Sequence, residues 1–335
     1  MLELRFPLHI EIKITNACNL RCIHCISDAG EKSINELSTQ EIFKIIDEAK
    51  KNGAFSIGLT GGEPFCRKDI FEIIDYIHKK KLNLVLTTNG TLLNEHIIEK
   101  IKTKISLMRI SLDHCVPEKH DYFRGMKGAF KKTLSTLYLL RRYRKYFQTT
   151  VLTVISKFNF YNFKEIVNYF KKVDIEAANF FLFAPFGRGE KNREKLELTK
   201  NHAKEFCKMI KILIKKEKKI KIHTNNPLMA LVEKYKLPRI CPAAITSCFI
   251  TETGRVIPCP YFYSLPNFDD NIQYSSVKKI WNESFFFKIL RDESYLASEC
   301  QQCKKKFTCF GGCRAAAFNE FGTILKPDPL CWIVK

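Results

Sequence analysis

The chain has 335 residues, 45% of them hydrophobic and 27% charged, which is an ordinary globular composition and long enough for two domains. Its start lacks the apolar stretch of a signal peptide, and no apolar run is long enough to span a membrane, so we expect a cytoplasmic protein with no membrane partner. The formal net charge of +21 favours solvated lysine-rich helix faces or a surface that attracts an acidic partner, such as an acidic peptide or a polycarboxylate. Nucleic acid is the least favoured of the acidic partners, because no nucleic-acid-binding motif accompanies the positive charge.

From residue 8 to about 220, short apolar runs alternate with amphipathic helical patterns. The helices include one opened by a capping box at Ser38 and Glu41, one opened by Asn162 and Glu165, and one over residues 128–142. We expect each apolar run to be a parallel strand that is buried on both faces. The predicted strands are His9–Thr15, Ser56–Thr60, Asn83–Thr88, Leu107–Leu112, Thr150–Ile155 and Asn179–Ala184.

Six such β-α units with right-handed crossovers predict an α/β fold, a partial parallel (βα)6 TIM-like barrel over residues 1–225. In such barrels the chemistry collects on the loops that follow the strands. Residues 226–335 show a different pattern of prolines, turns and cysteines, with a small hairpin around residues 249–257 and a helix over roughly 276–290. We expect a small cysteine-rich iron–sulfur domain there, in which metal supplies part of the folding energy.

Fourteen cysteines in a chain without a secretory signal indicate metal binding rather than disulfides. Cys18, Cys22 and Cys25 follow the first predicted strand directly, at the mouth of the predicted barrel. Three thiolates can hold a four-iron, four-sulfur cluster and leave one iron with an open position, whereas a structural zinc site closes with four ligands. A zinc site with a distant fourth ligand, or buried free thiols, is the alternative interpretation.

A second motif, Gly61-Gly62-Glu63, follows the second predicted strand. Paired glycines let the backbone approach a ligand closely, and the carbonyl groups and Glu63 can accept hydrogen bonds from an ammonium group. An ordinary glycine-rich turn would have the same sequence.

Together the cysteine triad and the Gly-Gly-Glu segment resemble the radical S-adenosylmethionine (radical SAM) superfamily. The resemblance implies that Cys18, Cys22 and Cys25 bind a [4Fe-4S] cluster, that the methionine part of S-adenosylmethionine chelates its open iron, and that electron transfer produces a 5′-deoxyadenosyl radical. It also implies a reductant such as flavodoxin or ferredoxin. By position, the residues expected to contact S-adenosylmethionine are His24, Gly61, Gly62, Glu63, Ser111, Asp113 and Arg124.

The C-terminal cysteines resemble a second family pattern, the SPASM extension, which binds two auxiliary [4Fe-4S] clusters. The resemblance therefore implies three clusters in all, and the zinc-ribbon interpretation is the alternative. It implies the ligands Cys241, Cys248, Cys259 and Cys313 for the first auxiliary cluster and Cys300, Cys303, Cys309 and Cys331 for the second. If Cys248 is not a ligand, the first auxiliary cluster has a position open to substrate.

Two further cysteines lie near the predicted mouth. Cys66 follows Glu63 closely, and Cys115 follows Asp113. A thiol at either position would be able to return a hydrogen atom to a substrate radical. Both cysteines also fit the role of a small buried hydrophobic residue.

The favoured function is modification of a ribosomally synthesised peptide, because many relatives with two auxiliary clusters are peptide maturases and their acidic leader peptides suit the positive charge. The sequence begins almost at the first predicted strand, so we expect a separate leader-peptide-binding protein. The alternative is tetrapyrrole side-chain modification in alternative haem biosynthesis. The segments around Arg124 and Arg188 resemble segments of the enzymes in that branch. Sulfatase maturation is disfavoured, because Pro260 stands where that subfamily has an acidic base. A zinc-stapled nucleic-acid binder is the non-enzyme alternative.

Overall fold

The computed structural model describes residues 4–232, 240–263 and 270–334. One sheet forms its centre, with the strand order β7-β6-β5-β4-β3-β2-β1-β8-β9. All neighbouring strands are parallel except the antiparallel pair β8 and β9. The strands are β1 (His9–Lys13), β2 (Ser56–Thr60), β3 (Asn83–Thr88), β4 (Leu107–Ser111), β5 (Gln148–Ile155), β6 (Ala177–Leu182), β7 (Lys221–His223), β8 (Ser247–Ile250) and β9 (Val256–Ile257).

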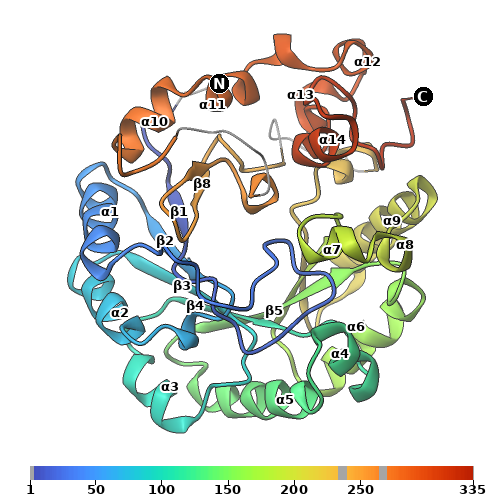
Figure 1. Cartoon of the computed structure of the whole chain (residues 1–335). Coiled ribbons are helices and arrows are strands. Elements are labelled where there is room, and N and C mark those ends of the chain that lie inside the picture. Colours follow the sequence, from blue (N-terminus) through green and yellow to red (C-terminus); the bar gives the residue numbers. More distant parts are fainter. Residues whose placement is uncertain (1–3, 233–239, 264–269, 335) are drawn as a thin grey trace.

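Helices surround the sheet on its outer side, so the fold is the expected partial (βα)6 barrel with a cysteine-rich region beside it (Figure 1). Helix α1 begins with the predicted capping box, in which Ser38 and Glu41 bond reciprocally. The helices are α1 (Thr39–Lys51), α2 (Ile70–Lys79), α3 (Glu95–Ile101), α4 (Pro117–Arg124), α5 (Ala129–Leu140), α6 (Phe163–Lys172), α7 (Arg188–Lys191), α8 (Arg193–Leu196), α9 (Lys200–Lys216), α10 (Val277–Glu283), α11 (Phe285–Arg291), α12 (Ser298–Gln301), α13 (Lys306–Cys309) and α14 (Arg314–Phe321).

Two local predictions were wrong in detail. The helix expected over roughly 276–290 is two helices, α10 and α11, because Ser284 ends the first in an extended conformation and caps the second. Asn162 precedes α6, but its side chain makes no capping bond to the helix backbone. No helix in the described ranges is long and apolar enough to cross a membrane.

The sheet extends past the six predicted strands at both ends. The short strand β7 adds to β6, and β8 adds to β1 with Cys248 opposite Ile10. The predicted hairpin is confirmed as β8 and β9, but its strand pairing with β1 was not predicted. The sheet therefore continues across the predicted domain boundary between residues 225 and 226.

The sequence analysis expected β1 to be apolar on both faces, but only its outward face is apolar. Its outward side chains, Ile10 and Ile12, are fully buried in the core between sheet and helices. Its inward side chains, His9, Glu11 and Lys13, are polar and line a cavity inside the barrel. Because side chains alternate along a strand, these three residues form one polar row down the barrel lumen.

Candidate active site

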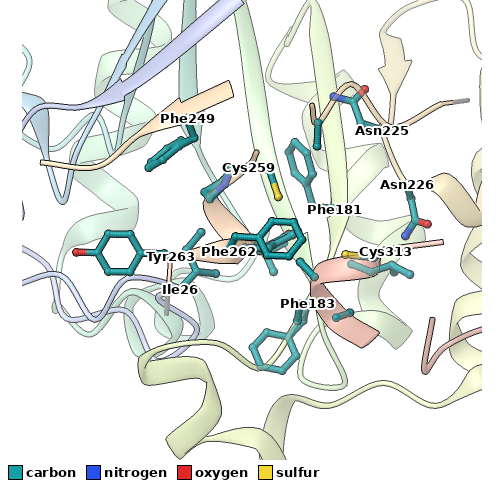
Figure 2. A pocket seen from close by; sticks show the side chains of 18 of the residues that line it. Ile26, Phe181, Phe183, Asn225, Asn226, Phe249, Cys259, Phe262, Tyr263 and Cys313 are labelled. Atoms are coloured by element: carbon teal, nitrogen blue, oxygen red, sulfur yellow. The ribbon is translucent and has the colours of Figure 1, made fainter. Parts of the chain in front are cut away.

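A cavity of about 660 Å³ runs from the barrel lumen to the cysteine-rich region. Aromatic side chains from both regions line it, among them Phe181 on β6, Phe183 just after β6, and Phe249 and Phe262 from the hairpin region (Figure 2). Cysteines of all three predicted cluster sets line it: Cys18, Cys22, Cys25, Cys241, Cys248, Cys259, Cys309 and Cys313. An apolar chamber between two groups of thiols suits a large, flat or aromatic substrate.

The loop after β1 brings Cys18, Cys22 and Cys25 together. Backbone N–H groups point at two of the sulfur atoms, since Leu20 N lies 3.4 Å from Cys18 Sγ and Ala29 N lies 3.3 Å from Cys25 Sγ. Burial raises the pKa of Cys18 to about 12 and also raises the pKa of Cys22. The unligated thiols are thus neutral, and cluster binding must displace their protons.

Arg188, the first residue of α7, holds this cysteine loop in place. Its guanidinium donates to the carbonyl oxygens of Cys22 (3.0 Å) and Ala29 (2.7 Å) and pairs with Asp28 (2.8 Å). The adjacent Gly187 has φ +55°, and a Cβ there would lie 2.5 Å from the carbonyl oxygen of Ile26. The sequence analysis noted this segment only for its resemblance to tetrapyrrole-modifying relatives and missed its supporting role.

The Gly-Gly-Glu turn packs directly on the same loop. Gly62 N donates to Thr15 O (2.7 Å), and a Cβ on Gly62 would lie 2.6 Å from the carbonyl oxygen of Ala17. Gly61 and Gly62 line the cavity, whereas the Glu63 side chain is fully buried behind them. The backbone of the turn thus faces the cavity.

The Glu63 carboxylate accepts hydrogen bonds from Thr88 Oγ1 (2.7 Å) and Asn89 N (2.8 Å), so it ties β2 to β3. Burial nevertheless raises its pKa to about 7. The folded chain thus holds a proton on Glu63 that the unfolded chain has already lost above its ordinary pKa near 4.5.

This proton makes stability depend on pH. As pH rises from about 4.5 to about 7, the folded state binds more protons than the unfolded state, so the free energy of unfolding falls, by up to about 3 kcal/mol for this one group. We expect Glu63→Gln to remove this part of the slope. Unfolding midpoints of both proteins at pH 5 and pH 7.5 measure it, and equal slopes would contradict the assignment.

The other residues expected near S-adenosylmethionine cluster around the triad. His24 is buried and stacks on Phe123, with 4.0 Å between ring centroids, and burial holds its pKa well below the usual value, so the ring is neutral. Arg124 forms a buried ion pair with Asp113 (2.5 Å), and its Nη1 lies 3.8 Å from Cys22 Sγ. Ser111 lines the cavity.

Electrostatic interactions connect most of the C-terminal cysteines within the two predicted sets, whose role as cluster ligands stays a prediction. Electrostatic interactions couple Cys259 with Cys241 and Cys313, while Cys300 is coupled with Cys303 and Cys331, and Cys309 with Cys300 and Cys331. The buried Asp328 joins the sets, because its carboxylate accepts from Cys313 N (2.7 Å) and interacts with Cys309. The thiols are the donor set that iron–sulfur clusters require.

The charged neighbours of Cys248 differ from those of the other cysteines in its predicted set. It lies on β8, where burial raises its pKa and its charged neighbours are Glu48 of α1 and Arg291 of α11 rather than other cysteines. Phe249, the next residue, points into the cavity (Figure 2). Cys248 lies opposite Ile10 of β1 in the sheet and is nonetheless among the residues that line the cavity, so its role as a cluster ligand stays a prediction.

We expect Cys248→Ala to retain the full iron content, about twelve irons per chain for three four-iron clusters. The free energy of unfolding should fall by about 1 kcal/mol, because the packing contacts of the buried sulfur atom are removed. Iron and sulfide analysis of anaerobically reconstituted protein measures this, with Cys259→Ala as the matched variant that should lose iron. A loss of about four irons in Cys248→Ala would make it a ligand after all.

The proposed hydrogen donors find no support in the cavity. Neither Cys66 nor Cys115 is among its lining residues. Burial raises the pKa of both thiols, and Cys115 lies 3.9 Å from His114 Nδ1. Their role as hydrogen donors stays a prediction. In the described ranges, no group of three or more His, Cys, Asp or Glu residues is arranged to hold a single metal ion.

A buried polar cluster joins β1 to the hairpin region beside the triad. Lys13 pairs with Glu252 (3.1 Å), and both side chains are only 2% exposed. Tyr263 accepts from Lys13 (2.8 Å) and donates to Glu252 (2.6 Å). No motif in the sequence pairs these residues, which are far apart along the chain.

Comparison with known proteins adds the family context. The profile of the radical SAM superfamily matches residues 12–173, and that of SPASM, an iron-sulfur cluster-binding domain, matches residues 241–304. The AdoMet-dependent heme synthase of Methanosarcina barkeri is 32% identical over 97% of this chain and 96% of its own. The subtilosin biosynthesis protein AlbA of Bacillus subtilis is 29% identical over 95% of this chain and 69% of its own.

Solved structures show the same fold. Streptococcus suis SuiB bound to S-adenosylmethionine superposes with a TM-score of 0.80 at 19% identity, covering 98% of this chain and 78% of SuiB.

Proposed function

The chain belongs to the radical SAM superfamily and carries a SPASM domain, and from that premise we propose that Cys18, Cys22 and Cys25 hold the radical-generating cluster. When bound, the cluster and S-adenosylmethionine supply a 5′-deoxyadenosyl radical that abstracts a hydrogen atom from substrate. The backbone of Gly61 and Gly62 binds the amino group, and Arg124 with Asp113 sets the charge beside Cys22. A low-potential reductant such as flavodoxin or ferredoxin delivers the electron.

The proposal also assigns a role to each of the two domains. Residues 1–225 form the radical-generating barrel, and residues 226–335 hold two auxiliary clusters. Cys300, Cys303, Cys309 and Cys331 bind one of them, and Cys241, Cys259 and Cys313 bind the other, which has a position open to substrate. When bound by these cysteines, an auxiliary cluster would supply a one-electron acceptor.

The substrate we propose is a tetrapyrrole with propionate side chains. The observation that carries this is the near end-to-end match, 32% identical, to an AdoMet-dependent heme synthase. The apolar, aromatic cavity suits a flat macrocycle, and the positive net charge suits its carboxylates. Converting a propionate to a vinyl group removes one hydrogen atom, carbon dioxide and one electron. The 5′-deoxyadenosyl radical would take the hydrogen atom, and an auxiliary cluster, when bound, would supply the acceptor for the electron.

The test is anaerobic incubation of the reconstituted enzyme with S-adenosylmethionine, reductant and an iron porphyrin that bears propionates. We expect equal amounts of 5′-deoxyadenosine and of carbon dioxide from the porphyrin, with vinyl products by mass spectrometry. Formation of 5′-deoxyadenosine without any change in the porphyrin would refute this substrate while leaving the radical chemistry in place.

A peptide maturase is the second candidate, and the resemblance to AlbA favours it. For a peptide substrate we expect 5′-deoxyadenosine formation to rise with a short acidic precursor peptide encoded beside this gene, with a separate protein binding its leader. Parallel assays with the peptide and the porphyrin decide between the two, because only the true substrate is altered in mass.

A further inference from the structure

The floor of the barrel lumen carries a polar group of side chains that the proposed radical chemistry does not use. His9 and Glu11 of β1, Thr87 of β3, Arg109 of β4 and Asn179 of β6 all line the deep end of the cavity. Elsewhere the chamber wall is largely aromatic and aliphatic. A polar floor beneath an apolar chamber indicates a position for a polar part of the substrate.

Arg109 is the most open cation of this floor. Its one hydrogen bond within the described residues is a long one, 3.5 Å from Nη1 to Glu11 Oε2, and its side chain is 28% exposed in the lumen. A guanidinium has five N–H donors in a fork that matches a carboxylate. Arg124 and Arg188, by contrast, are occupied by Asp113, Cys22 and neighbouring carbonyl groups.

Two further polar atoms of the floor lack a partner. Thr87 Oγ1 and Asn179 Oδ1 are buried and have no hydrogen bond to any described residue. Leaving a buried polar atom unpaired costs about 1–3 kcal/mol, so such atoms generally have a partner in the working protein. The Thr87 hydroxyl can donate, and the Asn179 amide can turn its NH₂ toward an acceptor.

The sequence of β2 keeps room for this group. Gly58 lies beside His9 and Glu11 in the sheet, and a Cβ there would be 3.0 Å from His9 Nε2 and 3.2 Å from Glu11 Cδ. Although burial opposes its ionisation, contacts with His9 and Arg109 lower the pKa of Glu11 to about 2, so Glu11 is an anion that holds Arg109 in the lumen.

We propose that Arg109 anchors a carboxylate of the substrate at the floor of the lumen, with Thr87 and Asn179 as neutral donors beside it. This inference rests on the proposed function, since it assigns a second carboxylate of the same tetrapyrrole. Arg109 precedes Ser111 by two residues on β4, which places it about 7 Å deeper than the cavity mouth. A macrocycle whose reacting propionate lies at the mouth therefore presents another propionate to Arg109.

The experiment measures binding rather than turnover. The reconstituted holoenzyme is titrated anaerobically with an iron porphyrin that has free propionates and with its fully esterified form, and the shift of the porphyrin absorbance band gives each dissociation constant. We expect the wild type to prefer the acid at least tenfold. In Arg109→Gln, acid binding should weaken about 10–100-fold while ester binding changes less than about twofold.

Three variants serve as controls. Arg142→Gln makes the same charge change on the surface, where Arg142 is 64% exposed, and should keep the wild-type preference. Glu11→Gln removes the competing carboxylate and should tighten acid binding, a direction that misfolding does not produce. If Arg109→Gln fails to hold about twelve irons, Arg109→Lys replaces it, and its preference should be intermediate because a point charge replaces the fork.

The outcomes separate the two proposals. If Arg109→Gln keeps the wild-type preference for the acid, or if Glu11→Gln weakens acid binding as much as Arg109→Gln does, the anchor is overturned and the proposed function stands. If the wild type binds neither porphyrin, both are overturned.

Discussion

Replacing Cys18, Cys22 and Cys25 together with alanine should abolish 5′-deoxyadenosine formation and lower the iron content from about twelve to about eight per chain. The three thiols lie on one loop, which Arg188 at the start of α7 holds in place. The other cysteine sets lie in the C-terminal region and do not depend on them. Anaerobic reconstitution, iron and sulfide analysis and chromatography of the nucleoside product measure both effects.

Cys207→Ala is the matched control for this experiment. Cys207 is a fully buried thiol on α9, far from the loop in sequence and packed in the apolar core. It should keep all its iron and its 5′-deoxyadenosine formation. If the triple variant still cleaves S-adenosylmethionine, or if the wild type contains zinc in place of iron, the radical SAM assignment of these cysteines fails.

Lys13→Met is expected to destabilise the protein by about 3–5 kcal/mol, the largest effect of any single change considered outside the clusters. It removes the cation from a pair whose two side chains are each 2% exposed, and it leaves the Glu252 carboxylate buried with only the hydroxyl groups of Tyr263 and Ser33. Methionine fills nearly the same volume, so the loss reflects the unpaired charge rather than a cavity. Urea midpoints of the reconstituted protein measure it.

The double variant Lys13→Met with Glu252→Leu tests the cause. Removing both charges leaves an apolar contact, so most of the lost stability should return. If the double variant is as unstable as the sum of the two single variants, the residues do not act as a pair, and the explanation from unpaired charge is wrong.

Much of this architecture could be predicted because its signals are local. The cysteine spacings, the Gly-Gly-Glu turn and the capping box at Ser38 each lie within a few residues, and the family resemblance places them on strands and loops. The pairing of β8 with β1, the Lys13–Glu252 pair and the support of the cysteine loop by Arg188 join residues from distant parts of the chain. No periodicity in the sequence encodes such contacts.

The surroundings of Cys248 have the same explanation. Spacing alone made it an eighth cysteine of a metal pattern, but its direction depends on the strand register, in which Cys248 lies opposite Ile10. A shift of one residue along β8 would exchange the directions of Cys248 and Phe249. The sequence analysis likewise did not predict that His9, Glu11 and Arg109 line the lumen, because the segments predicted as strands were treated as apolar throughout.

The ladder between β1 and β8 also determines the order in which the protein can fold during its synthesis. Strand β1 is among the first segments to leave the ribosome, and β2 soon covers one of its edges, but the other edge must wait for residues 247–250. Until then the nascent chain presents an unpaired strand edge next to reactive thiols. A stalled or truncated chain that ends before β8 is therefore the form most exposed to edge-to-edge aggregation. For the same reason, we expect the first cluster to be inserted after β8 has paired with β1.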